Sequence, residues 1–174
     1  MENILKFKIG ELLDKPVGTS LRYSIEGEVE LEDLKFNSDL SAKVELMKID
    51  KGVNVSAKDV KVIVELNCDK CLKEYDYEIN APFMERQFYF KKNKNDDIRD
   101  IYLVDMKKTE IDISEMLRQE INLHFPVVSV CSLQCKGLCP ICGVDRNVEK
   151  CNCEEENAVV VKQNPFSKLK DLLK

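Results

Sequence analysis

The chain has 174 residues, enough for one domain or for one domain with an appendage. Hydrophobic residues make up 44% of it and charged residues 34%, a balance typical of a soluble globular protein rather than a disordered one. The formal net charge of -5 and the absence of tryptophan argue against a broadly basic, aromatic-rich surface for nucleic acid, so any RNA contact would have to use a local patch.

The first part of the chain has the pattern of β-strands. Apolar and polar residues alternate in four segments, residues 3–9, 19–30, 40–50 and 53–68. A short helical turn is expected at residues 11–13. Lys51 and Gly52 form a turn signal between the last two segments, so the pattern predicts a long antiparallel hairpin that ends at Cys68.

Two further strands are predicted downstream. Residues 74–90 carry tyrosine, isoleucine and phenylalanine within a β-rich pattern, and residues 101–106 form a short apolar run. The polar, mixed-charge residues 91–99 between them predict a surface loop whose lysines are solvated.

One amphipathic helix is predicted near residues 113–125. Its apolar residues recur at steps of three and four, so one face can pack on the sheet. Asp112 or Ser114 is the expected N-cap, and Pro126 ends the helix. The single histidine, His124, lies at the C-terminal end, where interaction with the helix dipole or exposure to solvent is expected rather than metal ligation.

Eight cysteines fall in four close pairs with spacings typical of metal ligands. The pairs are Cys68 and Cys71, Cys131 and Cys135, Cys139 and Cys142, and Cys151 and Cys153. In the third pair, Pro140 pre-sets a tight turn, and Gly143 can take the positive φ that lets backbone N–H groups point at sulfur. We therefore expect one or two structural zinc ions, held by these eight thiolates.

The expected compartment is the cytoplasm. The N-terminus lacks the apolar region and cleavage pattern of a secretory signal. No apolar run approaches the roughly 18 residues needed to span a bilayer, so no membrane contact is expected. In a reducing compartment, close cysteine pairs bind metal more often than they form disulfides.

The four pairs can be divided between two sites in two ways. In the first division, the Cys68 pair joins the Cys131 pair, and the Cys139 and Cys151 pairs form a site that is local in sequence. In the second, the Cys68 pair joins the Cys139 pair, and the other two pairs combine. Locality favours the first division. Its long-range site would close a loop of roughly 60 residues and tie the helix to the sheet.

Together these elements predict an α+β fold. It has a mainly antiparallel β-sheet that could close into a barrel-like form, one packed helix, a zinc-bound cysteine-rich segment and a short C-terminal helix. The expected domains are residues 1–130, β-rich with the helix, residues 131–153, the zinc-binding segment packed on them, and residues 154–174, a connector and amphipathic tail.

Several motifs then follow one another along the second half of the chain. They are Leu66-Asn67-Cys68-Asp69-Lys70-Cys71, the helix exit from Glu120 to Val128, the block from Cys135 to Gly143 with Asn147, Cys151 and Cys153, and Asn164-Pro165-Phe166. In these motifs and their order the chain resembles the YceD family of large ribosomal RNA subunit accumulation proteins. The N-terminal third resembles that family only in its β pattern.

The resemblance implies a cytoplasmic, non-enzymatic factor for accumulation or processing of large-subunit ribosomal RNA and for ribosome assembly. The expected partners are pre-ribosomal large-subunit RNA, a basic ribosomal protein, or both, and no small-molecule substrate is expected. Some family members lack the later cysteines, which implies two separable sites and puts the functional need for the second in doubt.

Two other classes of function stay open. The chain shows no Gly-rich phosphate loop or paired-carboxylate motif, and a four-sulfur zinc site has no open position for water, so an enzyme is not expected. A redox sensor that releases zinc on thiol oxidation is one alternative. A zinc-dependent interaction module unrelated to ribosomes is the other.

Overall fold

The computed structural model describes residues 4–91 and 101–153. The predicted C-terminal helix within residues 154–174 lies outside the described residues, as does the predicted loop at residues 91–99 except for its first residue. None of the helices in the described part of the chain is long and apolar enough to cross a membrane.

The described residues form two compact units. The first unit takes residues 4–66 and 75–127, apart from the gap in the description. The second unit joins residues 67–74 to residues 128–153, so segments far apart in the sequence belong together. All eight cysteines lie in this second unit.

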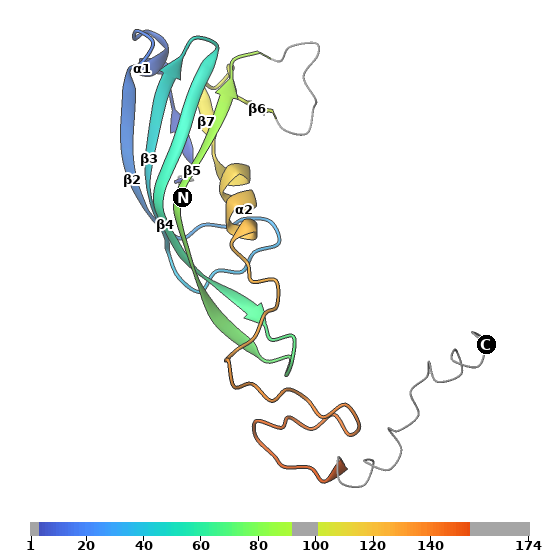
Figure 1. Cartoon of the computed structure of the whole chain (residues 1–174). Coiled ribbons are helices and arrows are strands. Elements are labelled where there is room, and N and C mark those ends of the chain that lie inside the picture. Colours follow the sequence, from blue (N-terminus) through green and yellow to red (C-terminus); the bar gives the residue numbers. More distant parts are fainter. Residues whose placement is uncertain (1–3, 92–100, 154–174) are drawn as a thin grey trace, which may run out of the picture. The chain divides into compact units, whose positions relative to one another are not determined.

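A five-stranded sheet in the order β2-β3-β4-β5-β6 is the main element of the first unit (Figure 1). Its strands are β2 (Ser20–Gly27), β3 (Leu40–Ile49), β4 (Gly52–Asn67), β5 (Glu74–Tyr89) and β6 (Tyr102–Leu103). The pairs β2–β3 and β3–β4 are antiparallel, whereas β5 and β6 are parallel. Among the described residues β2 and β6 are unpaired edges, so the sheet is open and the barrel-like closure is not found.

The predicted hairpin of residues 40–68 is confirmed. Strands β3 and β4 pair from Ile49 opposite Gly52 back toward Ser41 opposite Lys61. The register shifts on β3 between Ser41 and Lys43, and Asp59 on β4 has a left-handed φ of 54°. This bulge leaves Lys58 and Asp59 both exposed, which simple alternation along the strand would not allow.

The first unit also contains a separate two-stranded sheet. Strand β1 (Lys6–Lys8) pairs antiparallel with β7 (Glu110–Asp112), with Phe7 opposite Ile111. The short helical turn predicted after β1 is present as α1 (Gly10–Leu13). Strand β7 was not predicted, because three residues are too few to show alternation.

The predicted helix is present as α2 (Ser114–Leu123), which buries Met116, Leu117 and Ile121. The expected N-cap is wrong, because Ile113 occupies that position and makes no side-chain cap. The Asp112 carboxylate instead accepts a hydrogen bond from the Ser114 backbone N–H at 2.9 Å.

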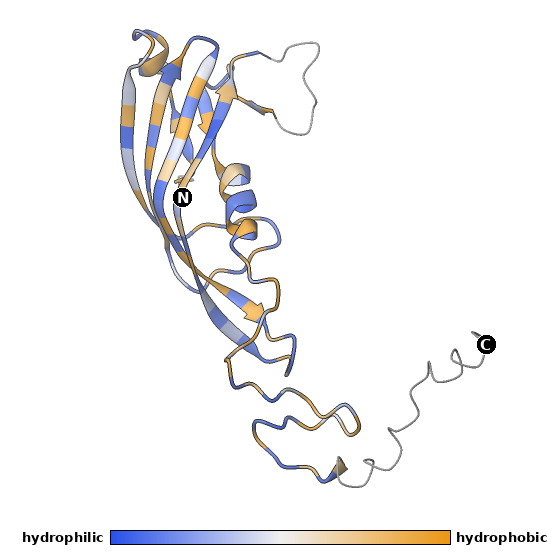
Figure 2. Cartoon of the chain, in the orientation of Figure 1, coloured by the Kyte–Doolittle hydropathy of each residue, from blue (hydrophilic) through white to orange (hydrophobic). Residues whose placement is uncertain are grey.

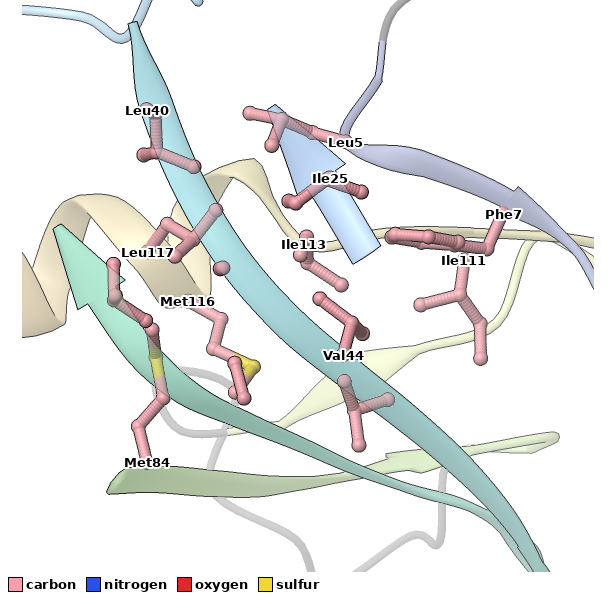
Figure 3. Close-up of a cluster of buried hydrophobic side chains, with 14 of the residues drawn as sticks. Leu5, Phe7, Ile25, Leu40, Val44, Met84, Ile111, Ile113, Met116 and Leu117 are labelled. Atoms are coloured by element: carbon pink, nitrogen blue, oxygen red, sulfur yellow. The ribbon is translucent and has the colours of Figure 1, made fainter. Parts of the chain in front are cut away.

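Helix α2 and the β1–β7 pair cover one face of the large sheet with apolar side chains (Figure 3). In Figure 2, orange and blue alternate along these strands, as expected when one face is buried and the other is solvated. The largest fully buried side chains are Phe88, Leu5, Ile9, Leu12, Leu40, Leu46, Ile79, Ile111, Ile113, Met116, Leu117 and Ile121. All belong to the first unit, so its core contains no cysteine.

Candidate metal centres

The structure gathers the eight cysteines into two groups of four. The first group is Cys68, Cys71, Cys131 and Cys135, and the second group is Cys139, Cys142, Cys151 and Cys153. Within each group all sulfur atoms lie within 4.8 Å of one another. This arrangement is the first of the two divisions considered from the sequence.

The sulfur spacing fits one tetrahedral ion. The Cys68 and Cys135 sulfurs are 3.8 Å apart, and the Cys71 and Cys131 sulfurs are 3.7 Å apart. A tetrahedron of thiolates about 2.3 Å from zinc has edges of about 3.8 Å. A disulfide would need about 2.05 Å. The first group therefore has the donor set and the spacing of a four-thiolate zinc site, and metal binding itself stays a prediction.

The first knuckle, residues 68–73, and the second knuckle, residues 139–144, have the same backbone turn. In the first knuckle, Leu72 N–H donates to the Cys68 carbonyl at 2.8 Å, and Cys68 N–H donates to the Lys73 carbonyl at 2.9 Å. In the second knuckle, Gly143 N–H donates to the Cys139 carbonyl at 2.9 Å, and Cys139 N–H donates to the Val144 carbonyl at 2.8 Å. The predicted positive φ of Gly143 is confirmed at 75°, and Leu72 adopts 60° at the matching position. The left-handed φ of Leu72 could have been predicted from its position directly after Cys71, which matches that of Gly143 after Cys142.

Backbone N–H groups stabilise one thiolate in each knuckle. Burial alone would raise the pKa of Cys68, but N–H groups of Cys131, Cys71 and Lys70 donate to its sulfur and lower that pKa to about 6. In the second knuckle, the N–H groups of Cys142 and Ile141 outweigh burial and lower the pKa of Cys139 to about 6.

Other thiols in each group are harder to ionise without a cation. Burial, followed by the neighbouring Cys135 and Cys71 thiols, raises the pKa of Cys131 to about 12. Hydrogen bonding with Cys142, followed by burial, raises the pKa of Cys153 to about 12. Four thiolates so close together repel one another, so an ion that binds all four must displace protons.

The segment that carries Cys131 is hydrogen-bonded to the first knuckle. Asp69 N–H donates to the Ser129 carbonyl, and Ser129 N–H donates to the Asp69 carboxylate, both at 2.7 Å. The Ser129 hydroxyl also donates to the Asn67 carbonyl at 2.8 Å. These contacts bring residues 60 positions apart together, and spacing alone does not predict them.

Asn147 links the loop of the second group to the first group. Its side-chain NH₂ lies 3.5 Å from the Cys135 sulfur, and its side-chain oxygen accepts the Lys136 N–H at 2.8 Å. The Asp145 carboxylate fixes the same NH₂ group at 2.7 Å. The sequence identified Asn147 only as part of a family motif, and this contact gives it a place beside a thiol.

The two groups differ in exposure. Cys68, Cys71 and Cys135 are buried, with Cys131 half-buried. In the second group only Cys139 is buried, and Cys142 is exposed.

Gly137 lets the chain pass close to the first knuckle. Its φ is 72°, and Leu138 N–H donates to the Lys70 carbonyl at 2.8 Å. A Cβ at Gly137 would lie 2.8 Å from that carbonyl oxygen, closer than real Cβ atoms approach. The spacing of the cysteines gives no sign that a glycine is required at this position.

Replacing Gly137 with alanine is expected to weaken metal retention by the first group, because backbone strain and the collision with the Lys70 carbonyl both push residues 135–138 away. Gly18→Ala is the matched control, since its φ is 90°, no atom lies within 4 Å of the added Cβ, and it lies in the first unit, away from the cysteines. It carries only the left-handed strain, about 1–2 kcal/mol. The measurement is the rate of zinc transfer to a colorimetric chelator. Equal rates for both variants would contradict the close approach.

A family model and two known proteins match parts of this chain. The family model described as large ribosomal RNA subunit accumulation protein YceD matches residues 58–173. A protein of Arabidopsis thaliana named large ribosomal RNA subunit accumulation protein YCED homolog 1, chloroplastic, is 40% identical over 47 residues, 27% of this chain. The protein of the same name from Zea mays is 43% identical over 49 residues, 28% of this chain.

These matches span 15% of the length of the Arabidopsis protein and 17% of that of the maize protein. No solved structure matches the chain significantly. The family model, in contrast, extends from the middle of β4 to the last residues and covers more than half of the 174 residues. The chain therefore belongs to the YceD family, as its motifs predicted.

Proposed function

We propose that this protein is a zinc-dependent, non-enzymatic factor that supports the accumulation or processing of large-subunit ribosomal RNA and assembly of the large subunit. The observation that carries the proposal is the match of residues 58–173, which hold all eight cysteines, to a family described by large ribosomal RNA subunit accumulation. Membership of this family supports a ribosome-related role.

In this proposal the metal has a structural role. Four thiols around one point fill every position of a tetrahedral zinc ion, which leaves no position for a reactive water. Zinc would offset the mutual repulsion of the thiolates and hold residues 67–74 and 128–135 together. Among the described residues, no third group of cysteine, histidine or acidic side chains gathers in the same way.

The proposed partners are pre-ribosomal large-subunit RNA, a basic ribosomal protein, or both, in the cytoplasm. The acidic net charge of -5 favours contact through a local patch if the partner is RNA, and supports general attraction if it is a basic protein. Neither a membrane nor a small-molecule substrate is part of the proposal.

A redox sensor is the second candidate, and the exposure of Cys142 favours it. An exposed thiolate ligand is accessible to oxidants, and its oxidation would release the metal. The sensor reading predicts that mild peroxide releases zinc from the second group while the first group, with three buried cysteines, keeps its ion.

Depleting the protein in its host is expected to lower the ratio of large-subunit to small-subunit ribosomal RNA. Wild-type protein should restore the ratio. Cys68→Ser should not restore it, because the first group would lose a ligand. Ser132→Ala, an exposed change between two cysteines, is the control that should restore it fully. An unchanged RNA ratio on depletion would refute the proposed function, and rescue by Cys68→Ser would refute its dependence on zinc.

A further inference from the structure

The solvent-facing side of the large sheet has a hollow lined by cations from three neighbouring strands. Arg22 on β2, Lys43 on β3 and Lys58 on β4 surround a space of about 290 Å³. Helix α2 and the β1–β7 pair pack on the other face of this sheet (Figure 1). One carboxylate, Glu45, is also in the lining, so cations outnumber acids there although the whole chain is acidic.

Two of these cations face each other directly. Lys43 and Lys58 are cross-strand partners in the β3–β4 pairing, an arrangement in which like charges destabilise a sheet. The bulge at Asp59 moderates this repulsion, because the Asp59 carboxylate pairs with the Lys43 ammonium at 2.8 Å. Among the described residues Lys58 forms no close ion pair, and its longer-range attraction to the Glu45 and Asp59 carboxylates leaves its N–H donors open to an anion.

The rest of the lining suits a phosphate group. Ser24 and Ser56 add hydroxyl groups to the hollow. Arg22 pairs with Glu45 at 3.1 Å, and its side chain is 80% exposed, so its guanidinium stays accessible from solvent. Ammonium, guanidinium and hydroxyl donors around one small space are the groups that bind phosphate oxygens.

An exposed aromatic ring lies beside the unpaired cation. Phe83 on β5 is 50% exposed, and the Lys58 ammonium lies 5.9 Å from the centre of its ring. An apolar ring of this size at the surface of a sheet can stack against an unpaired base, while a nearby lysine contacts the backbone phosphate.

We infer that this face of the sheet binds single-stranded RNA, with a backbone phosphate in the hollow and a base stacked on Phe83. The inference rests on the proposed function and adds to it the surface that contacts RNA. It assigns that contact to the first unit and leaves the cysteine groups a structural role. The aromatic ring favours a single strand, since the bases of a duplex are not free to stack on a side chain.

The test is binding of a fluorescein-labelled single-stranded oligouridylate to the full chain, by anisotropy over a range of salt concentrations. Each phosphate contact contributes about 0.7 to the slope of log affinity against log salt for a single strand. Lys58→Gln should therefore reduce the slope by about 0.7. Phe83→Ala should weaken binding about 5- to 100-fold without changing the slope.

Lys107→Gln is the matched control, because it removes the same charge from an exposed turn outside the hollow. Its slope and affinity should equal those of the wild type. Thermal unfolding of each variant should occur no lower than that of the wild type, which separates loss of contact from loss of fold. No binding by the wild type, or equal effects of Lys58→Gln and Lys107→Gln, would overturn the inference.

Rescue of the depleted host separates this inference from the proposed function. If depletion leaves ribosomal RNA unchanged, the proposed function fails whatever the binding data show. If depletion lowers large-subunit RNA but Lys58→Gln and Phe83→Ala both restore it fully, the function stands and this surface is wrong. A protein partner would then be the contact to seek.

Discussion

Cys68→Ser is expected to remove one of two zinc ions and to unfold residues 67–74 and 128–135. Cys68 is fully buried in the first group, and a serine hydroxyl does not replace a thiolate ligand. Structural zinc in small domains contributes about 10–16 kcal/mol at neutral pH, far more than the hydrogen bonds between Asp69 and Ser129 can supply. The first unit should stay folded, because its core contains no cysteine.

The measurement is zinc per chain by elemental analysis, together with unfolding followed by circular dichroism. Cys151→Ser is the matched variant in the second group and should also leave one ion. The double variant Cys68→Ser/Cys139→Ser decides the division of ligands. It should leave no zinc, because the two residues belong to different groups. One remaining ion would mean that they share a site, as in the second division.

The strands and the helix that the sequence predicts well are those long enough to show a period. In the β3–β4 hairpin, apolar and polar residues alternate several times on each side of Gly52, and α2 shows a clear apolar face. Strand β7 is too short to show a period, and its pairing with β1 joins residues about a hundred positions apart. The prediction of a barrel-like closure is not confirmed for a related reason: closure depends on pairing between the edge strands, and no sequence pattern indicates that pairing.

In the candidate metal centres too, local features could be predicted from the sequence and long-range contacts could not. The motif from Cys139 to Gly143 predicts the second knuckle and the positive φ at Gly143, because both follow from local turn geometry. Spacing leaves two divisions of the pairs open, and locality favours the one that the structure shows. The deciding contacts are the hydrogen bonds of Ser129 with Asp69 and the close pass of Gly137 by Lys70, which act across long stretches of chain.

Gly52→Ala is expected to destabilise the first unit by about 3 kcal/mol or more, because the added methyl group has nowhere to go. Its Cβ would lie 2.0 Å from the Phe88 carbonyl oxygen and 3.0 Å from the Tyr89 Cα. Both neighbours are backbone atoms of β5, so relief requires β4 and β5 to separate at this point. The sequence marks Gly52 as a turn residue, whereas the structure requires it for the close approach of two strands.

Gly10→Ala is the control, since its Cβ would meet nothing closer than the Thr109 hydroxyl at 4.0 Å and alanine favours the helical position at the start of α1. Urea unfolding followed by circular dichroism compares the two. Gly52→Ala should unfold at a much lower urea concentration than the wild type, and Gly10→Ala at the same concentration or slightly higher. Equal midpoints for the two variants would mean that β4 and β5 do not pack as closely at Gly52 as the structure has them. Because Gly52 lies in the strand that carries Lys58, loss of the β4–β5 contact should also abolish RNA binding by the sheet face, whereas Gly10→Ala should preserve it.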